Sequence, residues 1–155
     1  MYSRHNLITV LALLLAFATG PQGLFAQSVD STLVVGTWGV DVPATIGLMP
    51  PEKKAAYNGL PEEVRQQMEG ELAARQLAFG EGHAYQLRMG TGDSYSATWA
   101  LDAATGQLTL DFEGEGAEQE QVLSVDNGSM RLRIETDPAS PAIYHELQLY
   151  LISRP

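Results

Sequence analysis

The sequence predicts a mainly β protein, an eight-stranded antiparallel up-and-down barrel with a helical insertion between its first and second strands. Three observations support this fold. Apolar and polar residues alternate over most of the chain after residue 76, with the period of two that is typical of half-buried strands. Short turns containing glycine separate the alternating stretches. Eight consecutive antiparallel strands close most simply into a barrel, which leaves no open edge.

Residues 1–26 are predicted to be a secretory leader. Arg4 precedes an apolar run, and small residues follow before "GLFAQ". An uncut N-terminal anchor is the alternative, but the run is too short to cross a bilayer. Cleavage after Ala26 is expected to leave an exported chain, periplasmic or secreted, that begins at Gln27 and has no stable membrane span. Residues 27–155 are expected to form one β-barrel domain.

The chain after the leader is strongly acidic and has no cysteine. The leader contains one of the nine Lys and Arg and none of the nineteen Asp and Glu, which leaves eight basic against nineteen acidic residues and a net charge of −11. Such a surface repels nucleic acid and anionic lipid head groups, so neither is expected as a partner. The lack of cysteine excludes disulfides and thiolate metal sites. We therefore expect a hydrophobic core to provide the stability.

The first strand is predicted in "LVVGTWGVDV", residues 33–42, because this run is β-branched and aromatic. The positions expected to share its apolar face are Val34, Trp38, Val40 and Val42. Pro43 ends the strand. In the segment that follows, Pro51 and Pro61 each stand just ahead of acidic residues, which is a usual start for helices.

Two short helices are therefore predicted between the first two strands. Their apolar stripe is expected to consist of Tyr57, Leu60, Val64, Met68 and Leu72. The residues expected to face water are Glu62, Glu63, Arg65, Gln66 and Glu69. A stripe of this kind more often packs against a core than binds a ligand.

Seven further strands are predicted after residue 76, each with one apolar face. Their inward residues are expected to be Leu77 and Phe79; Tyr85, Leu87 and Met89; Tyr95, Ala97, Trp99 and Leu101; Leu108, Leu110 and Phe112; Leu123 and Val125; Met130, Leu132 and Ile134; and Leu147, Leu149 and Leu151. The other face of the last strand is also apolar, with Tyr144, Tyr150 and Ile152, and the helices are expected to cover it.

The acidic run "EGEGAEQE", residues 113–120, is predicted to be a solvated loop between two of these strands. It could offer carboxylates to calcium, but calcium loops alternate Asp and Asn ligands, and this run has none. No charged residue is expected to face inward on the clearly alternating strands.

The Gly-Thr-Trp sequence in "GTWGVD" on the first strand resembles the lipocalin signature, which Gly36 and Trp38 match. The runs "LMPPEKKAAYNGLPEEVRQQM" and "ATWALDAATGQLTL" make the chain similar to the bacterial secreted lipocalin-like domains. The resemblance implies that Trp38 plugs the closed end of the barrel and that Gly36 allows strands to approach. The helix pair is also similar to that of the fatty-acid-binding proteins, but those proteins are intracellular, and the leader argues against membership.

No catalytic or metal-binding constellation is visible in the sequence. His83 and His145 lie on separate predicted strands without metal-ligand spacing, and Gly-x-Ser-x-Gly is absent. Asp41 and Asp102, each three residues after a tryptophan, are interpreted as turn initiators. The three Gly-x-Gly pairs are interpreted as hairpin turns. We therefore expect no enzymatic activity, no cofactor and no bound metal.

Two functional hypotheses remain open. In the first, the protein is a binding module that holds a small apolar ligand inside the barrel, while the helices gate the mouth. The residues expected to contact that ligand are Tyr85, Tyr95, Ala97, Trp99 and His145; for His145 the alternative is a rim position bonded to a backbone carbonyl. In the second, side chains fill the barrel, and its outer surface binds a protein partner or an envelope component. Eight strands enclose only enough space for side chains or one small ligand.

Overall fold

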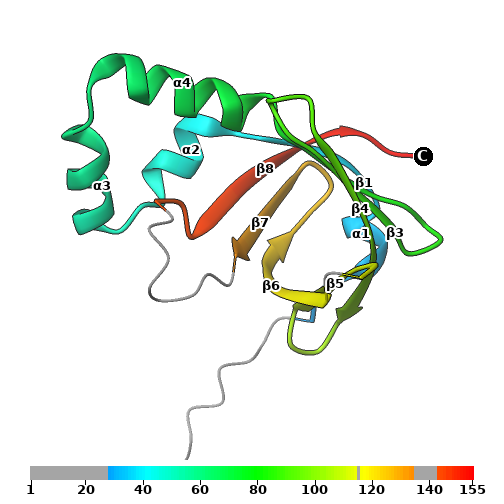
Figure 1. Cartoon of the computed structure of the whole chain (residues 1–155). Coiled ribbons are helices and arrows are strands. Elements are labelled where there is room, and N and C mark those ends of the chain that lie inside the picture. Colours follow the sequence, from blue (N-terminus) through cyan, green and yellow to red (C-terminus); the bar gives the residue numbers. More distant parts are fainter. Residues whose placement is uncertain (1–27, 115, 135–142) are drawn as a thin grey trace, which may run out of the picture.

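The computed structural model describes residues 28–114, 116–134 and 143–155, and it shows a closed barrel of eight antiparallel strands (Figure 1). The strands are β1 (Gly36–Val40), β2 (Gln76–Phe79), β3 (Ala84–Arg88), β4 (Ser94–Asp102), β5 (Gln107–Phe112), β6 (Gly116–Val125), β7 (Ser129–Ile134) and β8 (Glu146–Ser153). Each strand pairs with the next, and β8 pairs with β1. The predicted up-and-down barrel is therefore confirmed. The predicted leader lies outside the described residues.

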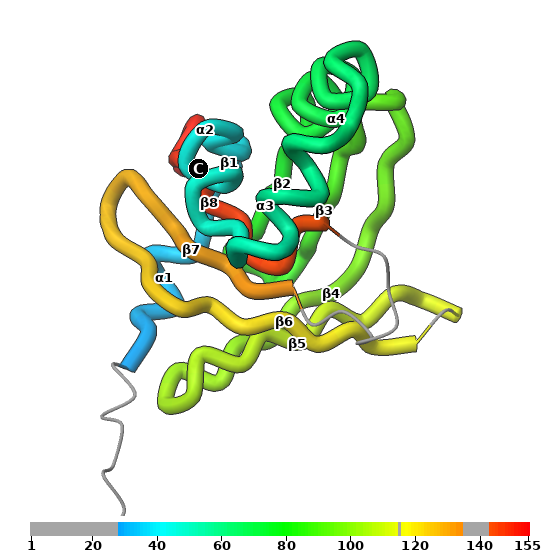
Figure 2. The backbone as a smooth tube through the Cα atoms, turned by 90° about the vertical axis from the view of Figure 1, so that its left-hand side faces the viewer, coloured from blue at the N-terminus to red at the C-terminus, as the bar shows by residue number. Residues whose placement is uncertain are grey.

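Four helices accompany the barrel within the described residues. The first precedes β1 and the other three form the insertion between β1 and β2: α1 (Ser31–Val34), α2 (Val42–Gly47), α3 (Pro51–Asn58) and α4 (Glu62–Ala73). The predicted insertion is confirmed, with three helices instead of two. Figures 1 and 2 show α1 apart from α3 and α4, and we call the two ends of the barrel the α1 end and the insertion end. Among the described residues, no helix is long and apolar enough to span a membrane.

The first strand is shorter than predicted because both ends of the run 33–42 are helical. Val34 belongs to α1, whose N-cap is Asp30. Val42 begins α2, whose N-cap is Asp41. Each capping carboxylate accepts a hydrogen bond from a backbone N–H in the following turn, at 2.9 and 3.0 Å. These bonds satisfy amides that a helix start leaves unpaired, so local capping outweighs the β propensity of the valines.

Trp38 closes the α1 end of the barrel. Its side chain is fully buried, and its Nε1 donates a hydrogen bond of 2.8 Å to the carbonyl oxygen of Val34 in α1. Gly36 has a φ of +149°, and a Cβ atom there would lie 2.9 Å from Leu151 Cδ1 and 2.9 Å from the carbonyl oxygen of Ser153. A side chain at this position would collide with β8. Gly36 therefore allows β1 to lie close to β8, and Trp38 is buried beside it.

The core occupies the barrel interior behind Trp38. Its fully buried inward side chains include Phe79, Leu108, Leu110, Met130, Leu132, Leu147 and Leu149. In β6 the face differs from the prediction, because a register irregularity between Val122 and Ser124 places Val122, not Leu123, in the core. A bulge adds one residue to a strand, so a pattern with a period of two assigns the wrong face on one side of it.

The predicted solvated loop at residues 113–120 is instead largely strand, since β6 begins at Gly116. In the pairing of β5 with β6, Glu118 lies opposite Leu110 and Glu120 lies opposite Leu108. Directly opposed residues point to the same face of an antiparallel pair, and both leucines are buried in the core. Two glutamates therefore point into the barrel, and the expectation that no charged residue faces inward is wrong.

The side of α4 that packs against the rest of the protein is more polar than predicted. Leu72 is buried, but Val64 is 41% exposed and does not belong to the buried stripe. Arg65 and Glu69, which were expected to face water, are half-buried instead. The hydroxyl of Tyr57, a buried residue of α3, donates a hydrogen bond to the Glu69 carboxylate. This bond joins the two helices and explains why a glutamate lies on the inner side of α4.

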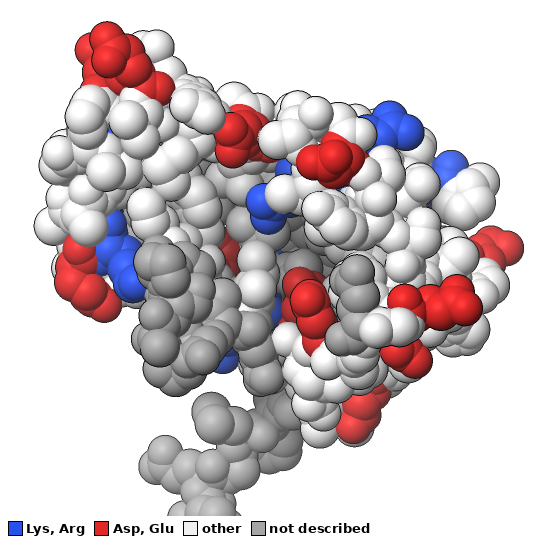
Figure 3. Space-filling view, in the orientation of Figure 1, with Lys and Arg blue, Asp and Glu red and all other residues white. Residues whose placement is uncertain are grey.

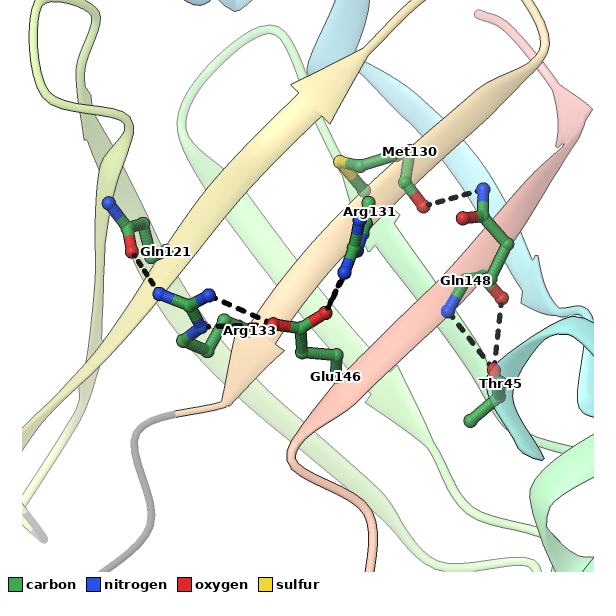
Figure 4. A network of polar contacts seen from close by, with 7 residues as sticks. All are labelled: Thr45, Gln121, Met130, Arg131, Arg133, Glu146 and Gln148. Atoms are coloured by element: carbon green, nitrogen blue, oxygen red, sulfur yellow. Dashed lines mark hydrogen bonds and ion pairs between the residues drawn. The ribbon is translucent and has the colours of Figure 1, made fainter. Parts of the chain in front are cut away.

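The outer face of β8 is only partly covered by the insertion. Thr45 of α2 is buried and joins the backbone of Gln148, whose N–H donates to Thr45 Oγ1 at 3.0 Å (Figure 4). Further along the strand, Tyr150 and Ile152 remain 47% and 44% exposed. The expectation that the helices cover this face is therefore wrong for its second half.

Trp38 gives the first test of this architecture. Trp38→Ala should lower the free energy of unfolding by about 3–5 kcal/mol, because it leaves a large cavity in the plugged end. Trp38→Phe keeps the aromatic packing but leaves the Val34 carbonyl unpaired, and should cost about 1–3 kcal/mol. Denaturant titration measures both. The control is Ile152→Ala, at an exposed position. A loss below about 1 kcal/mol for Trp38→Ala would contradict the plug.

Candidate functional site

The inward faces of the strands differ between the two ends of the barrel. Near the α1 end these side chains are dry, with Trp38 and Met130 both fully buried. Toward the insertion end, Leu87 and Ala97 are only half-buried, and Tyr95 is 45% exposed. The inward face of β3 and β4 toward the insertion end is therefore less completely covered than the core around Trp38 and Met130.

Three of the predicted ligand contacts lie together on this side. Tyr85 is buried on β3 and lies opposite Ala97 of β4. The next inward pair toward the mouth is Leu87 and Tyr95. The Tyr85 ring lies 6.3 Å from the ring of Phe112, measured between centroids, in an edge-to-face arrangement. These side chains form one apolar wall, which we call the aromatic wall.

Trp99, the fourth predicted contact, lies deeper, at the α1 end. It lines a pocket of about 460 Å³ between α1, the β2–β3 hairpin and the end of β8. Its Nε1 donates a hydrogen bond of 3.0 Å to the carbonyl oxygen of Gly80. The ring of His83 packs on Trp99 at a centroid distance of 5.3 Å, and its Nδ1 lies 3.0 Å from the Trp99 carbonyl oxygen. Trp99 therefore holds the hairpin in place.

His145, the fifth predicted contact, does not join the others. It lies just before β8 and lines a small pocket of about 60 Å³ with residues of α2 and of the segment after it. Its backbone carbonyl accepts a hydrogen bond of 2.9 Å from the N–H of Ile134. The interior position of His145 beside Leu147 stays a prediction.

A group of buried polar atoms without hydrogen-bond partners lies toward the insertion end. Among the described residues these atoms are Arg65 Nε, Arg75 Nε, Glu120 Oε2 and Tyr144 OH. Arg65 lies in α4 and Arg75 between α4 and β2. Glu120 lies in β6, and Tyr144 lies two residues before the start of β8. Buried polar groups are normally paired, because an unpaired one costs free energy. We call the half-buried Arg75, Glu120 and Tyr144, together with the exposed Glu118 that acts on Glu120, the interior polar cluster.

The groups of this cluster act on one another electrostatically. Burial, reinforced by the neighbouring Glu118, raises the pKa of Glu120 to about 7, and the Arg75 guanidinium opposes the shift. Burial also raises the pKa of Tyr85, with a further contribution from Glu120. The pKa of Tyr144 is raised by burial and then by Glu69, again against Arg75. The aromatic wall and the polar cluster are therefore parts of one site.

An ion-pair network on the outer face fastens the start of β8 beside this site (Figure 4). Glu146 accepts hydrogen bonds from Arg131 Nε at 2.8 Å and from Arg133 Nη2 at 2.9 Å. Burial alone would raise the pKa of Glu146, but the two arginines outweigh it and hold the pKa below its usual value. Because Tyr144 lies two residues before Glu146, the network also limits where its hydroxyl can lie.

The surface carries the acidic character expected from the composition. Figure 3 shows acidic side chains on several parts of one face, and no broad basic patch lies among the described residues drawn there. Asp102 begins the β4–β5 turn by accepting a hydrogen bond of 2.9 Å from Ala104 N–H, as predicted. No cluster of three His, Cys, Asp or Glu suited to a metal ion occurs within the described residues.

Comparison with known proteins adds a structural likeness. No protein-family model matches the chain, and no curated protein does. Among solved structures, the chain is similar to a DUF4847 family protein from Bacteroides vulgatus ATCC 8482. The identity is 13%, the TM-score is 0.42, and the match covers 88% of this chain and 99% of the other. A likeness at this TM-score indicates neither a ligand nor an activity.

Glu120 makes stability depend on pH. Its raised pKa means that the folded protein holds the Glu120 proton more tightly than the unfolded chain does. The free energy of unfolding should therefore fall as pH rises from about 4.5 to about 7. Glu120→Gln cannot ionise, so it should remove this fall and be more stable than the parent above pH 7, by roughly 1–3 kcal/mol.

Urea titrations at several pH values measure this effect. The matched control is Glu113→Gln, which removes a carboxylate at an exposed position. The control should keep the slope of the parent protein. Parallel stability profiles for the parent and Glu120→Gln would contradict the burial of this carboxylate.

Proposed function

We propose that this protein is a lipocalin-like, non-enzymatic binding module that is exported after loss of its leader and holds one small, largely apolar ligand. The ligand lies inside the insertion half of the barrel. The observation that carries the proposal is the partial exposure of inward side chains on β3 and β4 toward the insertion end, Leu87, Ala97 and Tyr95, in contrast with the fully buried Trp38 and Met130 at the α1 end. An eight-stranded barrel has room for one small ligand where its own side chains leave space.

The aromatic wall supplies the apolar contacts for this ligand. Tyr85, Leu87, Tyr95, Ala97 and Phe112 share one side of the interior, and Ala97 is the small residue among them. Ligand pockets are mostly lined by apolar and aromatic groups with a few polar groups among them. The interior polar cluster provides those polar groups.

The insertion fixes one side of the opening. A Cβ atom on Gly90, in the β3–β4 turn, would lie 2.8 Å from the carbonyl oxygen of Glu71 in α4. The turn and the end of the helix are therefore in direct backbone contact, and glycine is needed there. The ligand enters beside α4 and not through the β3–β4 turn.

The larger pocket at the α1 end supports a ligand less well. Two of its polar side chains already bond to the protein, since Trp99 Nε1 donates to the carbonyl oxygen of Gly80 and Arg154 Nη1 donates to the carbonyl oxygen of Val35 at 2.9 Å. None of the unpaired buried side-chain atoms of the described residues lies on its lining. The unpaired buried atoms lie toward the insertion end instead, and they include Arg75 Nε, Glu120 Oε2 and Tyr144 OH.

One observation favours the second candidate function, a surface that binds a protein partner. Tyr150 and Ile152 are both exposed on the outer face of β8. Single exposed apolar residues are ordinary on protein surfaces, and two neighbours make only a small patch. The open interior is the stronger observation.

Ala97 distinguishes an open interior from a packed one. Wild-type protein should bind a naphthalene dye saturably, with a change in dye emission. Ala97→Leu should weaken binding by about tenfold, because the added carbons occupy the ligand's space. Ala100→Leu, exposed on the same strand, is the matched control and should bind like the parent.

The stability of the Ala97→Leu variant can contradict the open interior. An open interior accepts the leucine, so the variant should remain folded in a urea titration. If the wild type binds no apolar probe and Ala97→Leu unfolds the protein, the interior has no spare volume. The partner-binding function would then replace this proposal.

A further inference from the structure

The wall of β6 that faces the interior carries two carboxylates. Glu118 and Glu120 alternate with outward residues on this strand, so they project to the same side about 7 Å apart along the strand. Glu120 Oε2 is buried and has no hydrogen-bond partner among the described residues. An unpaired buried carboxylate is costly, so a ligand group that pairs with it gains free energy.

The charge next to these carboxylates is not balanced by the protein. Arg75 is the basic residue that acts on Glu120, while Glu118 acts in the opposite sense. The titratable groups around Glu120 are thus Glu118 on β6, Arg75 before β2 and Tyr85 on β3. Once Glu120 is ionised, its carboxylate and that of the solvent-exposed Glu118 therefore face one guanidinium, and the excess negative charge attracts a cation.

The aromatic wall near these carboxylates suits the same cation. The rings of Tyr85 and Phe112 meet edge to face, and Tyr95 lies partly exposed nearer the mouth. Aromatic faces attract ammonium groups and also cover apolar chains. The acidic character of the whole chain raises the local concentration of cations around the opening.

An anionic amphiphile fits the site less well. Arg75 Nε and Tyr144 OH are unpaired donors that could meet a carboxylate. A carboxylate bound there would, however, share the interior with Glu118 and Glu120, and like charges in a low-dielectric site repel strongly. The balance of charge favours the cation over the fatty acid.

We propose that the ligand is an amphiphilic cation, with an ammonium group bound at Glu118 and Glu120 and an apolar body against Tyr85, Tyr95 and Phe112. This inference rests on the proposed function and names its ligand class. It also makes Glu120 the residue that selects the charge of the ligand, whereas the aromatic wall binds the apolar part without regard to charge.

The test compares three probes of equal chain length by isothermal titration calorimetry. They are octyltrimethylammonium, octanol and octanoate, each below its micelle concentration. The ammonium compound should bind most tightly. Glu120→Gln should weaken binding of the ammonium compound by about tenfold or more, while the affinity for octanol stays unchanged. The control Glu113→Gln, at an exposed site, should bind all three like the parent.

Measuring the affinity for octyltrimethylammonium at several pH values adds a second test. A mere structural disturbance by Glu120→Gln would not remove a pH dependence of this affinity. Octyltrimethylammonium has no proton to lose, so its affinity should rise between about pH 5.5 and about pH 8 as Glu120 ionises. In Glu120→Gln this rise should be lost, whereas Glu113→Gln should keep it.

The outcomes separate the two proposals. If octanol or octanoate binds as tightly as the ammonium compound, or if Glu120→Gln leaves its affinity unchanged, the cation inference is overturned and the binding module stands. If none of the three probes binds and the naphthalene dye also fails, both are overturned. Preferential binding of the ammonium compound that depends on Glu120 supports both.

Discussion

The pairing of β1 with β8 is the constraint on which the rest of the structure depends. It closes the sheet and so fixes the width of the interior, because strand number sets barrel diameter. Once the barrel is closed, each inward side chain must either pack against others or line open space. Gly36 allows β1 to approach β8 at this seam, and Trp38 next to it plugs the α1 end by bonding to α1. The same residues that close the sheet therefore seal one of its two ends.

The other end follows from how the chain uses its inward positions. Large apolar residues fill the α1 half, but the inward positions nearer the insertion include Ala97, Glu118 and Glu120. Small and charged residues fill a core less completely than large apolar ones, and several buried polar atoms there lack partners. Burial and the neighbouring Glu118 raise the pKa of Glu120. In the proposed function, stability and ligand binding thus belong to different parts of one barrel.

Much of this fold could be predicted from the sequence, because alternation and glycine turns are local signals. The candidate site could be predicted only in part. Tyr85, Tyr95 and Ala97 were found by strand parity, but Glu118 and Glu120 were missed because an acidic, glycine-bearing run has the composition of a loop. Their alternation with Val122 was the available signal. The bulge after Val122 and the inward side of α4 could not have been predicted, since both depend on tertiary pairing.

The central claim, one dry half and one open half, is tested most directly by methyl NMR with a neutral paramagnetic agent small enough to enter the barrel. Methyl signals of Leu87 and Ala97, at the insertion end, should broaden as the agent is added, because these side chains face open space. Those of Leu132 and Leu149, fully buried toward the α1 end, should stay sharp. Equal protection of all four methyl groups would contradict the account, because it would show a barrel packed along its whole length.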